Sequence, residues 1–125
     1  MASQHLRVLV AEDEKTASHA TQKLLSSMGH ESEVVCDGIE VLLALKRRTF
    51  DLILMDLQMP VMDGLQATSR VRQLFGSTKP IIFAVTANYG KGFQKACESA
   101  GMQGFLTKPI ESSKIQELIE DWFPE

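Results

Sequence analysis

Acidic, hydroxyl and amino side chains stand in this sequence at the points where its apolar segments end. Asp56 directly follows four consecutive apolar residues. Glu12 and Asp13 follow the first apolar segment, whereas Thr86 and Lys108 follow the fourth and the fifth. A carboxylate at the rim of a buried strand is unfavourable unless a cation or hydrogen-bond donors meet it. Asp56 is therefore predicted to be the reacting group, and the other four side chains are predicted to surround it.

These residue types match the requirements of phosphoryl transfer to a carboxylate. Three carboxylates close together repel one another unless a cation joins them, and an all-oxygen ligand set favours Mg²⁺. Lys108 supplies a positive charge suited to a phosphoryl oxygen, and Thr86 supplies a hydroxyl donor. With Asp56 as nucleophile, the site could take up a phosphoryl group. Since no base is placed to activate water, the aspartyl phosphate is expected to persist.

The surrounding pattern predicts five strands that alternate with five helices, and hence a doubly wound α/β fold with a parallel sheet. A weak second strand with polar flanks suits a sheet edge, which favours the flavodoxin-like order 2-1-3-4-5. In such sheets chemistry lies beyond the carboxyl ends of the strands, where all five candidate residues would meet. The predicted strands are 6–11, 33–36, 51–56, 81–85 and 104–107.

Helical spacing gives each helix an expected buried face. Asp37 and Asp63, each before a glycine, are interpreted as turn or cap residues, and the helix at about 90–100 is expected to be mobile. Three histidines are expected at the surface, and two cysteines are expected to be reduced and mostly buried. The residues expected to face inward are Ala17, Ala20, Leu24, Met28, Ile39, Leu42, Leu43, Ala67, Val71, Leu74, Phe93, Ala96, Cys97, Ile115, Leu118, Ile119 and Trp122.

Length and composition predict a single domain over 1–125 with an ordered core at about 6–123. The chain has 125 residues, is 44% hydrophobic and 23% charged, and carries a formal net charge of −3. This mild acidity gives no reason to expect binding to nucleic acid or to an anionic membrane. No membrane-spanning run or secretion signal is visible, so the expected location is the cytoplasm, with tethering to a membrane through a larger parent protein left open.

Over nearly its whole length the sequence resembles the receiver domain of two-component response regulators. The resemblance rests on four segments in this order and spacing, namely 8–14, 54–64, 85–88 and 105–109. The run from Asp56 to Gly64, Asp-Leu-Gln-Met-Pro-Val-Met-Asp-Gly, is most similar to receivers of hybrid histidine kinases.

The resemblance implies a role for each site residue. Asp56 would be phosphorylated by a histidine-borne phosphoryl group, which comes from a histidine kinase or a histidine-containing phosphotransfer domain. Asp13, Asp56 and the backbone carbonyl of Gln58 would hold Mg²⁺, with Glu12 acting through water. Phosphate binding and switching would fall to Thr86, Ala87, Lys108 and Phe105. A cis peptide bond is implied between Lys108 and Pro109.

Two other functions remain open at this point. One is an aspartyl-phosphate hydrolase on a related sheet, although those enzymes carry a second acid where this chain has Gln58. The other is a receiver-shaped interaction module that takes no phosphate, or a flavodoxin-like flavin binder. The complete acidic pocket argues against the module, and the lack of a phosphate-cradling loop after the first strand argues against the flavin binder. The expected behaviour is that of a switch that catalyses its own phosphoryl transfer and slow dephosphorylation, not of a turnover enzyme.

Overall fold

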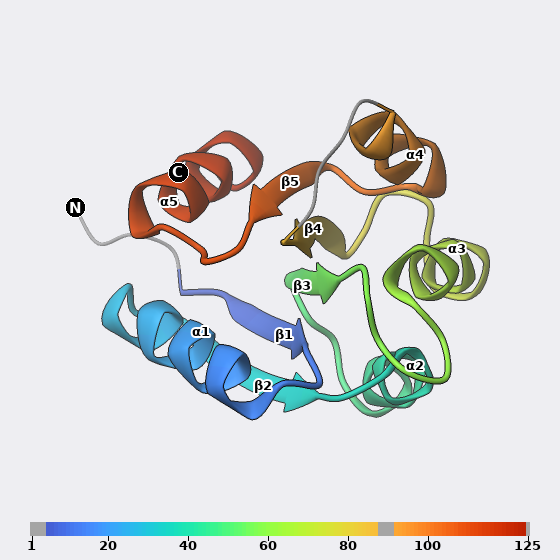
Figure 1. The fold of residues 1–125 in the computed structure, drawn as a ribbon, viewed down its shortest axis with the longest axis horizontal. Helices are drawn as coiled ribbons and strands as arrows, with labels where there is room; N and C mark the ends of the chain where they lie inside the picture. The colour runs from blue at the N-terminus through green and yellow to red at the C-terminus, as the bar shows by residue number, and fades with distance from the viewer. Residues whose placement is uncertain (1–4, 88–91, 125) are drawn as a thin grey trace.

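The computed structural model describes residues 5–87 and 92–124. Its centre is a parallel five-stranded sheet in the order β2-β1-β3-β4-β5 (Figure 1), as the sequence predicted. The strands are β1 (Arg7–Ala11), β2 (Glu31–Val35), β3 (Leu52–Asp56), β4 (Ile81–Thr86) and β5 (Gly104–Thr107). The helices are α1 (Lys15–Ser27), α2 (Gly38–Arg47), α3 (Gly64–Leu74), α4 (Phe93–Ala100) and α5 (Ser112–Trp122). The start of the predicted helix over 90–100 lies partly outside the described residues.

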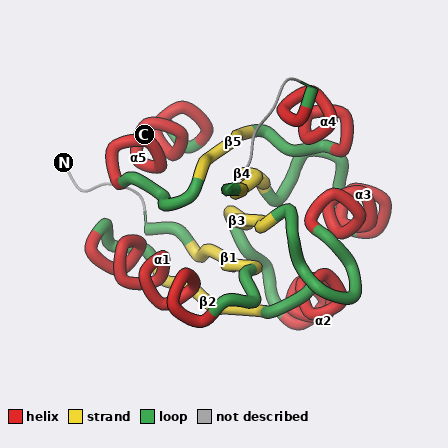
Figure 2. Tube along the Cα trace, viewed as in Figure 1, coloured by secondary structure: helices red, strands yellow, loops and turns green. Residues whose placement is uncertain are grey.

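Helices cover both faces of the sheet. Helices α1 and α5 lie against one face, and α2, α3 and α4 lie against the other (Figures 1 and 2). Every residue of β3 is buried, and its side chains alternate between the two layers. Leu52 and Leu54 join the core beneath α1 and α5, whereas Ile53 and Met55 join the core beneath the other three helices. The central strand is therefore held from both sides, which fixes the position of the residue at its end.

The predicted cap residues occupy the starts of their helices. The Asp37 side chain accepts a hydrogen bond from the amide of Glu40 at the start of α2 (2.8 Å). Asp63 forms a capping box with Gln66 at the start of α3, because each side chain accepts from the other residue's amide. Both helices therefore begin at a defined point on the side of the sheet where the carboxyl ends of the strands lie.

Several helical residues expected to face inward are exposed. Ile39 and Leu43 of α2, Leu74 of α3 and Trp122 of α5 are exposed, as are Ala20 and Ala96. In α2 the buried positions are instead Val41 and Ala44. Apolar residues on α2 extend around more of the helix than the sheet can cover, while Leu74 and Trp122 lie in the last turns of their helices.

The expected positions of His30 and Cys36 are also corrected. His30 is buried, because it follows the end of α1 and packs under the chain that enters β1. Cys36 follows β2 at the edge of the sheet and is exposed, while Cys97 of α4 is buried as expected. Among the described residues, no helix has the length and apolar character needed to cross a membrane.

A guanidinium group ties together the end of the sheet opposite the acidic residues. Arg72 of α3 donates to the carbonyl of Gly101 (2.9 Å), the carbonyl of Gly76 (3.3 Å) and the side-chain oxygen of Gln103 (3.0 Å). The same Gln103 oxygen accepts from the amide of Ile82 (2.8 Å). Burial lowers the pKa of Arg72 from its usual value. One side chain therefore joins α3 to the turn between α4 and β5.

Replacing this guanidinium should weaken the fold. We expect Arg72→Ala to lower the free energy of unfolding by about 2 kcal/mol, because several hydrogen bonds from a charged group are lost. Urea unfolding followed by circular dichroism would measure the change. Arg70→Ala, which removes an exposed arginine from the same helix, should change the free energy by less than about 0.5 kcal/mol. Equal effects of the two substitutions would contradict this account of Arg72.

Candidate functional site

Strand pairing brings three carboxylates to one end of the sheet. Strands β1 and β3 are neighbours with Ala11 opposite Met55, so the residues that follow, Glu12 and Asp56, are also side by side. Asp13 completes the group, and one oxygen of each carboxylate lies within 4.8 Å of the others. Glu12 and Asp56 are only 6% and 4% exposed, whereas Asp13 is open to solvent.

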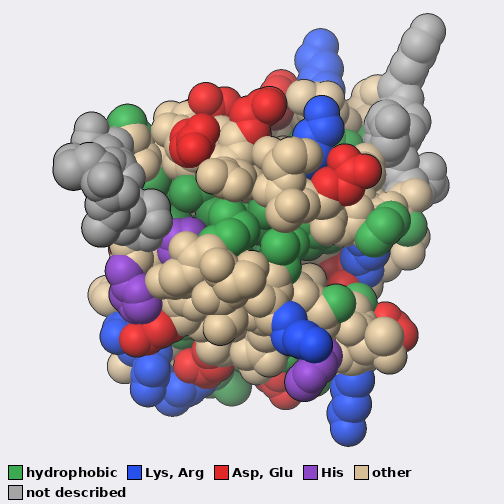
Figure 3. Space-filling model, turned by 90° about the vertical axis from the view of Figure 1, so that its left-hand side faces the viewer, with side chains coloured by type: hydrophobic (Ala, Val, Ile, Leu, Met, Phe, Trp, Pro, Cys, Tyr) green, Lys and Arg blue, Asp and Glu red, His purple; other side chains and the backbone are tan. Residues whose placement is uncertain are grey.

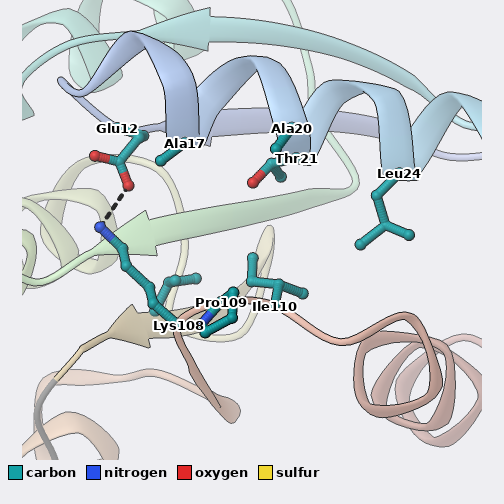
Figure 4. A pocket seen from close by; sticks show the side chains of 9 residues that line it. Glu12, Ala17, Ala20, Thr21, Leu24, Lys108, Pro109 and Ile110 are labelled. Atoms are coloured by element: carbon teal, nitrogen blue, oxygen red, sulfur yellow. Dashed lines mark ion pairs between the residues drawn. The ribbon is translucent and has the colours of Figure 1, made fainter.

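Lys108 reaches the two buried acids from the far side of β4. Its Nζ lies 2.6 Å from Oε1 of Glu12 and 2.9 Å from Oδ2 of Asp56. Figure 4 shows the side chain extended toward Glu12, with the first of these ion pairs drawn as a dashed line. The Lys108 amide donates to the Thr86 carbonyl (2.8 Å), which anchors the lysine beside the end of β4. The peptide bond to Pro109 is cis, as the resemblance implied, and a second cis bond precedes Pro80.

Burial sets the protonation of this cluster. Burial raises the pKa of the Glu12 carboxyl, and the charge of Asp56 adds to the rise, while hydrogen bonds from Lys108 and from the Glu14 amide oppose it. Burial by itself would lower the pKa of Lys108, but hydrogen bonds to Glu12 and Asp56 and the charges of both acids raise it overall. The lysine is therefore the cation that both acids share. Three carboxylates gather around the one charge of Lys108, so a further cation would be favoured at this group.

The loop after β3 packs closely behind Asp56. The amide of Gln58 donates to Oδ1 of Asp56 (3.0 Å), so each oxygen of the Asp56 carboxylate has a donor. At Gly64 an added Cβ would collide with the backbone carbonyl oxygen of Asp56, which requires glycine there. Val61 has a positive φ of 70° and is 79% exposed. The Met62 amide donates to the Pro60 carbonyl across Val61 (2.7 Å). A β-branched residue in this conformation is strained, and such strain clusters at functional sites.

The residues assigned to switching lie on β4 and β5 or directly after β4. Thr86 is buried at the last position of β4, next to Thr107 of β5. Ala87 is exposed at the mouth of the site. Phe105 is half-buried and packs against the core beneath α2, α3 and α4. Thr86 and Phe105 therefore lie on neighbouring strands, and Thr86 is the one at the carboxyl ends of the strands, where the acidic cluster lies.

A groove of about 310 Å³ begins at the Glu12–Lys108 ion pair and runs between α1 and the segment after β5. Ala17, Ala20 and Leu24 of α1 form one wall, and Pro109 and Ile110 face them (Figure 4). Figure 3 looks onto this side of the molecule, where apolar side chains gather in a band between charged ones. The sequence predicts that these three α1 residues face the core. Leu24 does pack against the core beneath α1 and α5 and also borders the groove, whereas Ala17 is half-buried and Ala20 is exposed.

The structure brings the five residues that the sequence predicted to meet, Glu12, Asp13, Asp56, Thr86 and Lys108, to one end of the sheet, and their roles stay predictions. Sequence reasoning missed the amide of Gln58 as a donor to Asp56, because a backbone donor has no residue-type signal. It also missed the groove beside the site. The oxygen-only ligand set, the excess of negative charge and the solvent-accessible Asp13 fit a hard divalent cation held partly by water.

Comparison with known sequences supports one family. The family described as "Response regulator receiver domain" matches residues 8–120. Among curated proteins, "Hybrid signal transduction histidine kinase B" of Dictyostelium discoideum is 38% identical over 120 residues, which cover 87% of this chain. The match spans only 6% of that kinase's length, so the chain corresponds to a short segment of it.

Comparison with solved structures supports the same fold. The receiver domain of sensor histidine kinase PA1611 from Pseudomonas aeruginosa, solved with magnesium coordinated in its active-site cleft, has a TM-score of 0.87 at 31% identity. The alignment covers 98% of this chain and 100% of that one. The receiver domain of Ssk1 from Saccharomyces cerevisiae, crystallised with the phosphotransfer protein Ypd1, has a TM-score of 0.84 at 25% identity, with 94% and 88% of the two chains covered.

Removing the lysine charge should strengthen binding of a divalent cation. In Lys108→Met the acids lose the internal cation with which Mg²⁺ must compete, so we expect Mg²⁺ to bind about tenfold more tightly. Calorimetric titration with MgCl₂ at mildly alkaline pH would measure the dissociation constant. Lys114→Met, which removes an exposed lysine nearby, should leave the constant unchanged. Weaker binding in Lys108→Met would show that the lysine supports the metal site and does not compete with it.

Proposed function

Because the chain belongs to the response regulator receiver family, we propose that it is a phosphoacceptor switch in which Asp56 receives a phosphoryl group from a phosphohistidine. The observation that carries this proposal is the buried Asp56 carboxylate, held by Lys108 at 2.9 Å beside two further acids. A buried carboxylate with a cation already beside it is arranged to accept a phosphoryl group on one of its oxygens.

The transfer requires few changes at the site. An Asp56 oxygen forms a bond to phosphorus while the bond from phosphorus to the donor's imidazole nitrogen breaks and its electron pair leaves with the nitrogen. The negative charge then lies on phosphoryl oxygens slightly farther out. Lys108 has a long, flexible stem and three donors, so its ammonium group can follow that charge away from the carboxylate. Charge neutralisation and positioning supply most of the catalysis in such transfers.

Asp13, Asp56 and the carbonyl of Gln58 are the residues that we expect to hold Mg²⁺, with Glu12 acting through water. The cation would supply positive charge that neutralises the negative charge developing during phosphoryl transfer. Support comes from the carboxylate spacing and from the gathering of three carboxylates beside the one charge of Lys108.

We expect the phosphorylated state to be communicated through β4 and β5. Thr86 is the hydroxyl residue at the mouth that would turn toward the phosphoryl group, and Phe105 would move inward as it does so. The surface formed by α4, β5 and α5 would then change for downstream partners. A hydrolase function is disfavoured because Gln58, two residues after Asp56, has no carboxylate to activate water.

This chain offers the donor protein a suitable docking surface next to Asp56. The apolar groove along α1 starts at the ion pair that also holds the phosphoacceptor. A phosphohistidine on the side of a helix, flanked by apolar residues, could fit this groove and present phosphorus to Asp56. The complex of the Ssk1 receiver with Ypd1 supports a phosphotransfer protein as this partner.

The phosphoryl group should be attached to Asp56 and to no other residue. With Mg²⁺ and acetyl phosphate, we expect the intact protein to gain the mass of one phosphoryl group and Asp56→Asn to gain none, because an amide is not a nucleophile for this step. Intact-protein mass spectrometry measures the product. Asp51→Asn is the matched control, since Asp51 precedes the same strand and accepts from the Arg7 amide at its opposite end (2.8 Å). Equal labelling of Asp56→Asn and wild type would overturn the assignment.

A charge in the groove should impair transfer from a protein donor only. We expect Ala20→Asp to slow phosphotransfer from a phosphorylated histidine-containing phosphotransfer domain at least about tenfold, because the donor's apolar face would have to desolvate the new carboxylate. Labelling by acetyl phosphate should be unchanged. His19→Asp, an exposed neighbour on α1 that does not border the groove, serves as the control. Equal slowing in the two variants, or loss of acetyl phosphate labelling, would argue against docking at this groove.

A further inference from the structure

The buried histidine of this chain lies at the opposite end of β1 from Glu12. His30 is 7% exposed, and its Nδ1 accepts a hydrogen bond from the backbone amide of Leu6 (3.1 Å), the residue just before β1. An acceptor Nδ1 places the proton of the neutral ring on Nε2. The bond therefore exists only while His30 is neutral, because a protonated Nδ1 is a donor.

The backbone around His30 is fixed on every side. Its amide donates to the carbonyl of Leu25 (3.0 Å) and that of Gly29 donates to Ser26 (3.0 Å), which closes α1 in a Schellman motif with Gly29 at a φ of 89°. The next amide, that of Glu31, donates to the carbonyl of Leu6 (3.0 Å). The imidazole cannot move away from Leu6 without disturbing the end of α1 or the start of β2.

The charged residues near His30 lie in the segment before β1, in β1 and in β2. His5, which precedes β1, pairs with Glu31 (3.4 Å), and Glu31 also lies 3.6 Å from Nε of Arg7. The last turn of α1 has no basic residue, although its carbonyl end weakly favours a cation. Within the described residues no carboxylate pairs with the His30 ring. Burial, and secondarily the charge of His5, lower the pKa of His30 below its usual value.

We propose that His30 is a proton-sensitive anchor: when neutral it fixes the chain segment that enters β1, and when protonated it releases that segment. Protonation removes the acceptor of the Leu6 amide and leaves a buried charge without a carboxylate partner. Because the folded state resists this proton, its contribution to stability is complete above the unfolded pKa of about 6.5 and is lost as pH falls through the lower folded pKa.

Nuclear magnetic resonance can test the anchor at the residue itself. We expect the His30 ring to titrate below the ordinary histidine pKa of about 6.5. The protection factor of the Leu6 amide, corrected for intrinsic exchange, should fall at least about tenfold between about pH 7.5 and a pH about one unit below the His30 midpoint found in the same titration. A His30 midpoint at or above about 6.5, or a pH-independent protection of Leu6, would overturn the proposal.

Two substitutions separate the hydrogen bond from the titration. His30→Asn keeps an acceptor at the δ position that cannot be protonated, so Leu6 protection should remain high at both pH values. His30→Leu has no acceptor, so protection should be low at both. His19→Asn should behave as wild type. A pH dependence retained in His30→Asn would assign the effect to another group. Labelling of Asp56 by acetyl phosphate should be unaffected in every variant, which keeps this test independent of the proposed function.

Discussion

Two buried carboxylates and one lysine set the constraint on which the rest of the structure depends. A parallel sheet with β1 beside β3 places Glu12 next to Asp56, and burial makes that arrangement unfavourable without a counter-charge. Lys108 provides it, although its backbone follows β5, two strands away from β3. The lysine stem must therefore extend past the end of β4, and the hydrogen bond from its amide to the Thr86 carbonyl fixes where it starts.

This constraint explains why the site is responsive and not simply stable. Three carboxylates gathered around the one ammonium group of Lys108 give the cluster an affinity for further positive charge. A divalent cation beside Asp13 and a phosphoryl group on Asp56 would both redistribute the charges that Lys108 now balances. Thr86 is the part of β4 next to this lysine, because its carbonyl accepts a hydrogen bond from the Lys108 amide. The proposed coupling between the chemistry and β4 would therefore start at this hydrogen bond.

Sequence reasoning succeeded where a pattern is determined by the sheet. Apolar runs ending in acids, Thr86 and Lys108 predicted the strands, and a parallel sheet necessarily collects its strand ends at one edge. The failures occurred where burial depends on the tertiary shape. Ile39 and Leu43 have the spacing of a core face, but α2 covers the sheet with Val41 and Ala44. His30 gave no signal, because its partner is a backbone amide twenty-four residues away. Likewise, Lys108 pairs with Glu12 and Asp56 and not with Asp13 because of side-chain conformations that the sequence pattern does not predict.

The loop after β3 shows how the fold holds the reacting carboxylate in one orientation. Gly64 lets the start of α3 approach the Asp56 backbone, and the Asp63–Gln66 capping box fixes that helix start. The loop between Asp56 and Gly64 must then turn sharply, and Val61 in this loop has a positive φ. Its other end presents the Gln58 amide to Oδ1 of Asp56, so Oδ2 is the oxygen left to Lys108. The Gln58 donor belongs to the backbone of a closely packed loop, whereas Lys108 has a flexible stem, so Oδ2 has the donor that is more easily displaced. The close packing behind Asp56 thus makes the two oxygens of one carboxylate inequivalent.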